Sequence, residues 1–243
     1  MTKQPLASRV YDDLKGDILS CTLRPSQVVY EAELAQRYGV SKTPVREALN
    51  TLRQEGYIDV VPRRGYIVAP ISIQDVQQIL NLRMILEPVA AELAAQHATA
   101  EQMRQLRRLA QRTDTQRGPR SFSVDRQFHV LVAEASGNPR LAKYIAKVLE
   151  EVERVYNLCE GLPGSPRPGQ DRRPLLVDAI MKNDPQLARE IMVQTIQDAR
   201  TRVLELLLGM GTQTAAPVLI TSAPEGHQGR AARTTRRAAA RDA

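Results

Sequence analysis

The chain has 243 residues and a formal net charge of +7 at pH 7, with 42% hydrophobic residues, 4% aromatic residues and no tryptophan. This composition supports one large or two small domains with aliphatic cores, which favours helical packing over a β-sandwich. Cys21 and Cys159 are the only cysteines and are far apart, which excludes a disulfide framework and a zinc ribbon. The sequence shows no leader pattern and no long apolar run, so we expect a cytoplasmic protein with no membrane partner.

Residues 1–71 combine helix and strand patterns. Apolar residues at helical spacing predict helices over residues 8–19 and 31–38. Gly39 follows the second of these and is expected to cap it in the left-handed conformation.

A third helix is predicted to begin near residue 41, where Ser41 or Thr43 can cap it. Polar and basic residues recur at helical spacing on the face opposite its apolar residues. These are Lys42, Arg46, Asn50 and Arg53. Because the helix dipole favours acidic groups at an N-terminus, basic residues there indicate an anionic partner outside the chain. The stripe taken alone is equally consistent with a plain solvated face.

Two short β runs follow, YIDVV and GYIVA, with Arg63, Arg64 and Gly65 in the turn between them. They predict a hairpin with a basic tip. Two helices, a short turn, a basic helix and a basic hairpin together predict a winged helix-turn-helix. Residues 1–71 hold ten basic against eight acidic residues, so the argument for DNA depends on where these charges lie.

The run LRPSQVVYEAELAQRYGVSKTPVREALNTLRQEGYIDVVPRRGYIV resembles the DNA-binding domain of GntR-type bacterial transcription regulators. In that family the start of the recognition helix and the glycine-bearing wing tip touch the operator. The resemblance implies DNA contacts by Ser41, Lys42, Thr43, Arg46, Arg64 and Gly65, and the basic stripe and hairpin tip add Asn50 and Arg63. Lys42 stands where arginine is commoner, which weakens bidentate guanine readout. Ala32 stands where many members carry an arginine, so that contact is absent.

From Ser72 onward only helix patterns occur. Capping boxes, Ser72 with Asp75 and Thr99 with Gln102, predict the starts of two helices, the first running to about residue 95 and bent near Pro88. Four more helices are predicted, over residues 125–136, 141–155, 174–182 and 185–208. Six antiparallel helices of this length predict a bundle.

The predicted fold class is therefore mainly α, with a winged helix-turn-helix over residues 1–71 and an all-helical bundle over residues 72–211. Residues 212–243 contain almost no large apolar side chain and are expected to form a disordered basic tail. Such a tail either adds nonspecific phosphate contacts or serves as a solubilising end.

The runs LNLRMILEPVAAELAA and DRQFHVLVAEASGNPRL resemble the FCD ligand-binding domain of the FadR-like branch of the same family. Many members hold a divalent metal through an Asp, a His four residues later and two further histidines. Asp125 and His129 match the first pair, but Arg173 and Thr195 stand where the other two histidines are expected. Two ligands from one helix hold a metal poorly, and a guanidinium repels it. We therefore expect no cofactor, with Asp125 and His129 as weak metal candidates.

Arg173 is a candidate to replace the metal, since a guanidinium can bind the carboxylate of an organic acid. Arg83 is a second candidate for the pocket wall, with a simple salt bridge to Glu87 as the alternative. His129 is either a pocket residue or a core histidine hydrogen-bonded to Asp125. The expected effector-binding residues are thus Arg83, Asp125, His129, Arg173 and Thr195.

The expected function is a DNA-binding transcriptional regulator, a repressor as in most of the resembling family, that binds a double-stranded operator as a homodimer. A small-molecule effector, an organic acid, is expected to control its DNA affinity from the bundle. An alternative is a DNA-binding regulator with a vestigial pocket and no small-molecule input. Asp125 and His129 could also form an acid and base pair, but no nucleophile elbow or phosphate loop accompanies them, so no enzyme activity is expected.

Overall fold

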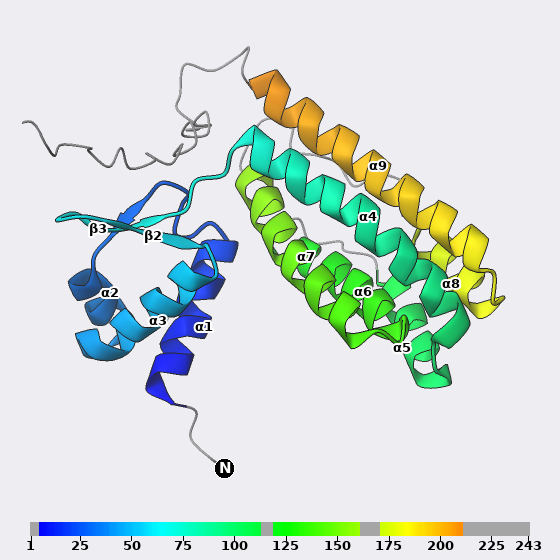
Figure 1. Ribbon diagram of the computed structural model, residues 1–243, viewed down its shortest axis with the longest axis horizontal. Coiled ribbons are helices and arrows are strands. Elements are labelled where there is room, and N and C mark those ends of the chain that lie inside the picture. Colours follow the sequence, from blue (N-terminus) through cyan, green and yellow to red (C-terminus); the bar gives the residue numbers. More distant parts are fainter. Residues whose placement is uncertain (1–4, 113–118, 161–170, 211–243) are drawn as a thin grey trace, which may run out of the picture.

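A computed structural model describes residues 5–112, 119–160 and 171–210 of the chain. Within these ranges the protein consists of a small N-terminal unit of helices and a short sheet, followed by a larger helical bundle (Figure 1). The fold class is the predicted one, a winged helix-turn-helix followed by an all-helical domain. Residues 212–243, for which a basic tail was predicted, lie outside the described ranges.

Three helices build the core of the N-terminal unit: α1 (Leu6–Leu19), α2 (Glu31–Tyr38) and α3 (Lys42–Gln54). They bury aliphatic side chains against one another, chiefly Val10, Leu14, Ile18, Leu34, Val45, Leu49 and Leu52. Gly39 ends α2 with φ +65°, as its position predicted. A tight turn follows Gly39 and sets the angle between α2 and α3. The basic face of α3 is exposed to solvent.

A three-stranded antiparallel sheet completes this unit, in the order β1 (Val28–Val29), β3 (Gly65–Val68), β2 (Ile58–Val61). The β2–β3 hairpin is the predicted wing. β1 was not predicted, because two residues are too few to show the alternation of a strand. It pairs Val29 with Tyr66 beside the wing tip.

Six helices form the bundle: α4 (Ile73–His97), α5 (Ala100–Ala110), α6 (Pro119–Ala135), α7 (Pro139–Glu160), α8 (Arg173–Met181) and α9 (Pro185–Met210). Both predicted capping boxes are present, at the starts of α4 and α5. α4 lies along α9 for most of its length (Figure 1). In the described residues, no helix is both long and apolar enough to cross a membrane.

Direct contacts join the two units at the end of the bundle where α4 begins and α7 ends (Figure 1). Asn157 Nδ2 of α7 donates to the Leu19 carbonyl oxygen at 2.8 Å, and Lys15 Nζ of α1 lies 2.9 Å from Glu150 Oε2 of α7. Arg154 of α7 donates to the carbonyl oxygen of Ala69, in the linker before α4. The linker and both units therefore meet at one junction.

Candidate functional site

The solvent-facing side of α3 carries every helix residue predicted to contact DNA. Pro44, Val45, Ala48 and Leu49 are buried, while Ser41, Lys42, Thr43, Arg46 and Asn50 are exposed. Ser41 is the N-cap residue, yet its side chain makes no cap hydrogen bond. The face therefore presents hydroxyl, ammonium, guanidinium and amide groups between Ser41 and Asn50.

A single carboxylate connects α3 to the wing. Arg46 donates from Nε to Glu31 Oε1 at 2.9 Å and from a terminal nitrogen to Glu31 Oε2 at 2.7 Å. The Tyr66 hydroxyl of β3 donates to the same Glu31 Oε1 at 3.1 Å. Glu31, which sequence reasoning missed, therefore orients Arg46 and contacts the wing close to its tip, through Tyr66.

Electrostatics support this arrangement. The hydrogen bond from Arg46, together with the one from Tyr66, lowers the pKa of Glu31 despite an opposing effect of burial. Glu31 is thus charged at neutral pH and accepts the fork from Arg46. The Arg46 side chain itself is 59% exposed, so its guanidinium can exchange this partner for a phosphate or a base edge.

The wing tip presents Arg63 and Arg64 to solvent. Arg63 has φ +63° and Gly65 has φ +90°, so the backbone turns through two left-handed residues here. A Cβ at Gly65 would lie 2.8 Å from the Val29 carbonyl oxygen of β1. The tip therefore requires glycine for close strand packing as well as for its conformation.

These groups suit a double-stranded nucleic acid. A basic helix face with hydrogen-bonding side chains can enter the major groove, while two arginines on a neighbouring hairpin reach the backbone or minor groove. Ala32 lies exposed at the start of α2, where the resembling family often supplies an additional arginine.

In the bundle, three buried side chains, those of Arg83, Glu87 and His129, form a second cluster. Arg83 Nε and His129 Nδ1 each lie 2.5 Å from a different carboxylate oxygen of Glu87. Their side chains are only 2 to 3% exposed. Burial alone would raise the pKa of Glu87, but the charges of Arg83 and His129 and their hydrogen bonds lower it to about 2. Glu87 is therefore a carboxylate that both partners hold inside the core.

The partner of His129 differs from the predicted one. Asp125 Oδ2 lies 3.8 Å from His129 Nε2 and its side chain is 50% exposed, while Glu87 takes the close contact. The salt bridge considered for Arg83 is present. Sequence reasoning could have found Glu87 as a charged residue on the buried face of a long helix.

The other two predicted effector residues have hydrogen-bond partners elsewhere. Arg173 donates to Asp171 at 2.8 and 2.9 Å and to the Arg112 carbonyl oxygen at 3.3 Å. Thr195 Oγ1 donates to the Ile191 carbonyl oxygen, within its own helix. The buried cluster thus brings together Arg83, His129 and, more loosely, Asp125.

The residues present do not fit a divalent metal of the kind the resemblance implies. Across the described ranges, no group of three or more His, Cys, Asp or Glu side chains is arranged to bind one. Asp125 and His129 offer two ligands from one helix, and Arg83 places a positive charge beside them.

Comparisons with known proteins agree with this geometry. A family model described as bacterial regulatory proteins, gntR family, matches residues 6–68, and one described as the FCD domain matches residues 78–198. The HTH-type transcriptional repressor RspR of Escherichia coli (strain K12) is 28% identical over 207 residues, which cover 84% of this chain and 91% of RspR. The uncharacterized HTH-type transcriptional regulator YieP of the same strain is 31% identical over 204 residues, covering 74% of this chain and 84% of YieP.

Solved structures show the same fold. E. coli McbR/YncC has a TM-score of 0.67 at 20% identity, with 84% of this chain and 100% of that chain covered. A putative GntR transcriptional regulator from Rhodococcus sp. RHA1 has a TM-score of 0.65 at 20% identity, with coverage of 82% and 97%.

Proposed function

The chain belongs to the gntR family of bacterial regulatory proteins and carries an FCD domain, and we propose that it is a transcriptional repressor that binds a pseudo-palindromic operator as a homodimer. The observation that carries the proposal is the arrangement around Glu31, in which one carboxylate contacts both Arg46 of α3 and Tyr66 of the wing. This carboxylate holds the recognition helix and the wing together, so that both can face the same duplex.

Exposed apolar side chains on the bundle support a homodimer. Leu82, Ile85 and Val89 lie on one face of α4 at helical spacing and are 45%, 64% and 36% exposed. Tyr144 of the neighbouring α7 is 65% exposed. We call these four residues the α4–α7 patch. Exposed large apolar groups on two neighbouring helices favour a protein partner, and a second copy of the chain satisfies the two-fold symmetry of an operator.

Control by a small organic acid is the second part of the proposal. Arg83 and His129 are buried groups between α4 and α6 that can bind a carboxylate, and an effector there competes with Glu87 for them. Release of Glu87 changes the packing of α4 on α6. Since α4 follows directly from the wing, that change reaches the DNA-binding unit.

The alternative function is a regulator without small-molecule input. Its supporting observation is that Glu87 already satisfies both Arg83 and His129 inside the core. In this case the cluster serves only to pack α4 against α6.

Selection from a pool of random duplexes tests the proposal. The full chain should enrich a sequence with two inverted half-sites, whose affinity then falls steeply with salt as phosphate-bound counterions are released. A thermal-shift screen with small carboxylic acids follows, in which a ligand at a hundred times its dissociation constant adds about 2.7 kcal/mol. A stabilising acid whose effect is lost in Arg83→Met supports the effector site. Operator binding without any responsive acid supports the alternative, and no enrichment at all contradicts DNA recognition.

A further inference from the structure

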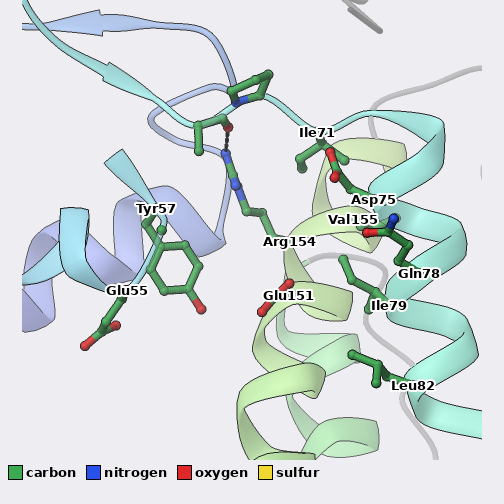
Figure 2. A pocket seen from close by; sticks show the side chains of 13 residues that line it. Glu55, Tyr57, Ile71, Asp75, Gln78, Ile79, Leu82, Glu151, Arg154 and Val155 are labelled. Carbon is green, nitrogen blue, oxygen red and sulfur yellow. Dashed lines mark hydrogen bonds between the residues drawn. The ribbon is translucent and has the colours of Figure 1, made fainter. Parts of the chain in front are cut away.

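A pocket of about 350 Å³ lies at the junction between the DNA-binding unit and the bundle (Figure 2). Its walls come from the turn after α3, from the linker before α4, and from α4 and α7. It is separate from the Arg83–Glu87–His129 cluster, none of whose residues lines it. A molecule bound here contacts both units at once.

Arg154 lines this pocket and carries a buried hydrogen-bond donor that is not used within the described residues. The residue is only 6% exposed, and one terminal nitrogen donates to the Ala69 carbonyl oxygen. Among residues 5–112, 119–160 and 171–210, its Nε has no hydrogen-bond partner. A buried guanidinium nitrogen without an acceptor is costly, so this site favours a ligand that supplies an anionic oxygen.

Glu151 lies one helical turn before Arg154 and also lines the pocket (Figure 2). Spacing of three residues places both side chains on one face of α7. Burial raises the pKa of the Glu151 carboxyl, although Lys147 and Arg154 partly oppose this shift. A positively charged group beside Glu151 would offset that cost.

Two further carboxylates, those of Glu55 and Asp75, line the pocket and make its walls more acidic. Both already have partners, because Glu55 is bound by Tyr11 and Lys15, and Asp75 is held in the capping box with Ser72. The acidic excess discourages a ligand that carries only negative charge. Apolar side chains complete the walls: Ile71, Ile79, Leu82 and Val155.

We propose that this junction binds a small zwitterion of the α-amino acid class. Its carboxylate accepts from Arg154 Nε, its ammonium group pairs with Glu151, and its side chain packs on the apolar wall of α4 and α7. The site differs from the bundle cluster in place and in ligand. Only its effect on DNA affinity rests on the proposed function.

Isothermal titration calorimetry on the full chain without DNA tests the site, using the common L-amino acids one at a time as probes. At least one should bind, and its α-amide and its N-acetyl derivative should bind about tenfold more weakly or worse, because each lacks one charge. If none binds, the Arg154 Nε–H is satisfied by solvent and the proposal is overturned. Equal binding of the N-acetyl derivative overturns the zwitterion assignment.

Variants locate the ligand. Glu151→Gln should weaken binding about tenfold, while Glu153→Gln, on the same helix but outside the pocket, should leave it unchanged. Arg154→Lys serves as a second variant that keeps the charge but moves the donor. Full binding in both pocket variants overturns the proposal. Arg83→Met should not affect this ligand, so failure of the bundle effector and failure of the junction site are distinguishable.

Discussion

Arg46 is the side chain on which DNA recognition depends most, because it is exposed, preoriented by Glu31 and near the start of α3. Arg46→Ala should weaken operator binding by about 1–3 kcal/mol. Fluorescence anisotropy with the selected duplex measures the change. Arg140→Ala removes an exposed arginine from the bundle and should leave affinity unaltered, whereas equal losses in both variants would indicate a nonspecific charge effect.

Glu87 holds two buried partners, so its charge contributes more to the stability of the fold than its volume does. Glu87→Gln leaves Arg83 without a counter-charge and should reduce the free energy of unfolding by about 3–5 kcal/mol, as measured in urea. Glu92→Gln, on the exposed side of α4, is the matched control and should have little effect.

The pH dependence of stability provides a second check on Glu87. The folded pKa of Glu87, about 2, lies below its ordinary value of 4.5. Its contribution is therefore complete above about pH 4.5 and is lost as the pH falls toward 2. The free energy of unfolding of the wild type should fall more steeply over that range than that of Glu87→Gln, and parallel curves would contradict the assigned charge.

The positions of individual residues were predictable where their spacing along the sequence alone assigns them to one face of a helix. The exposed basic residues of α3 follow from a 3.6-residue period and needed no tertiary information. The contact of Glu87 with His129 spans 42 residues and depends on how α4 packs on α6, which no local pattern specifies. Glu31 was missed for the same reason, since its two partners come from a later helix and a strand.

At the scale of elements, the capping box of α4 offers a direct test. The Ser72 hydroxyl oxygen accepts from the Asp75 backbone N–H at 3.0 Å, and the Asp75 carboxylate accepts from the Ser72 backbone N–H at 2.8 Å. Ser72→Ala should lower the free energy of unfolding by about 1 kcal/mol. Ser41→Ala should cost less, because the Ser41 side chain makes no cap bond in α3. Chemical denaturation compares the two, and a larger loss at Ser41 would contradict the assignment.

The wing tip has its own test. Gly65→Ala places a methyl group against β1 at a left-handed φ, so it should destabilise the N-terminal unit by about 1 kcal/mol or more and weaken DNA binding. Gly16→Ala has nothing within 4 Å of the new Cβ and lies within α1. That variant should stabilise the fold by about 0.5–1 kcal/mol, and the opposite ranking in thermal unfolding would refute the stated role of Gly65.

Elements with local signals were predictable, and those defined by pairing were not. Capping boxes and the glycine after α2 lie within a few residues of the ends that they mark. β1 exists only because Val28 and Val29 pair with β3, and α6 begins at Pro119, earlier than its apolar pattern indicates. The site in the bundle was therefore predictable as a region but not as a set of contacts.

For the whole molecule, the α4–α7 patch is the proposed dimer contact. Ile85→Glu puts a charge at its most exposed aliphatic position on α4 and should shift the protein from dimer to monomer in analytical ultracentrifugation. Operator affinity should fall in parallel, since each monomer then binds one half-site. Leu208→Glu, at a similarly exposed position on α9, is the control, and an unchanged dimer in Ile85→Glu would place the contact elsewhere.

Hydroxyl-radical footprinting of the full chain on its selected duplex tests the central claim most directly. Two recognition helices and two wings, related by two-fold symmetry, should protect two stretches of backbone centred about one helical turn apart. Arg46→Ala should weaken both stretches together. A single protected stretch, or protection that Arg46→Ala leaves intact, would contradict recognition by paired α3 helices.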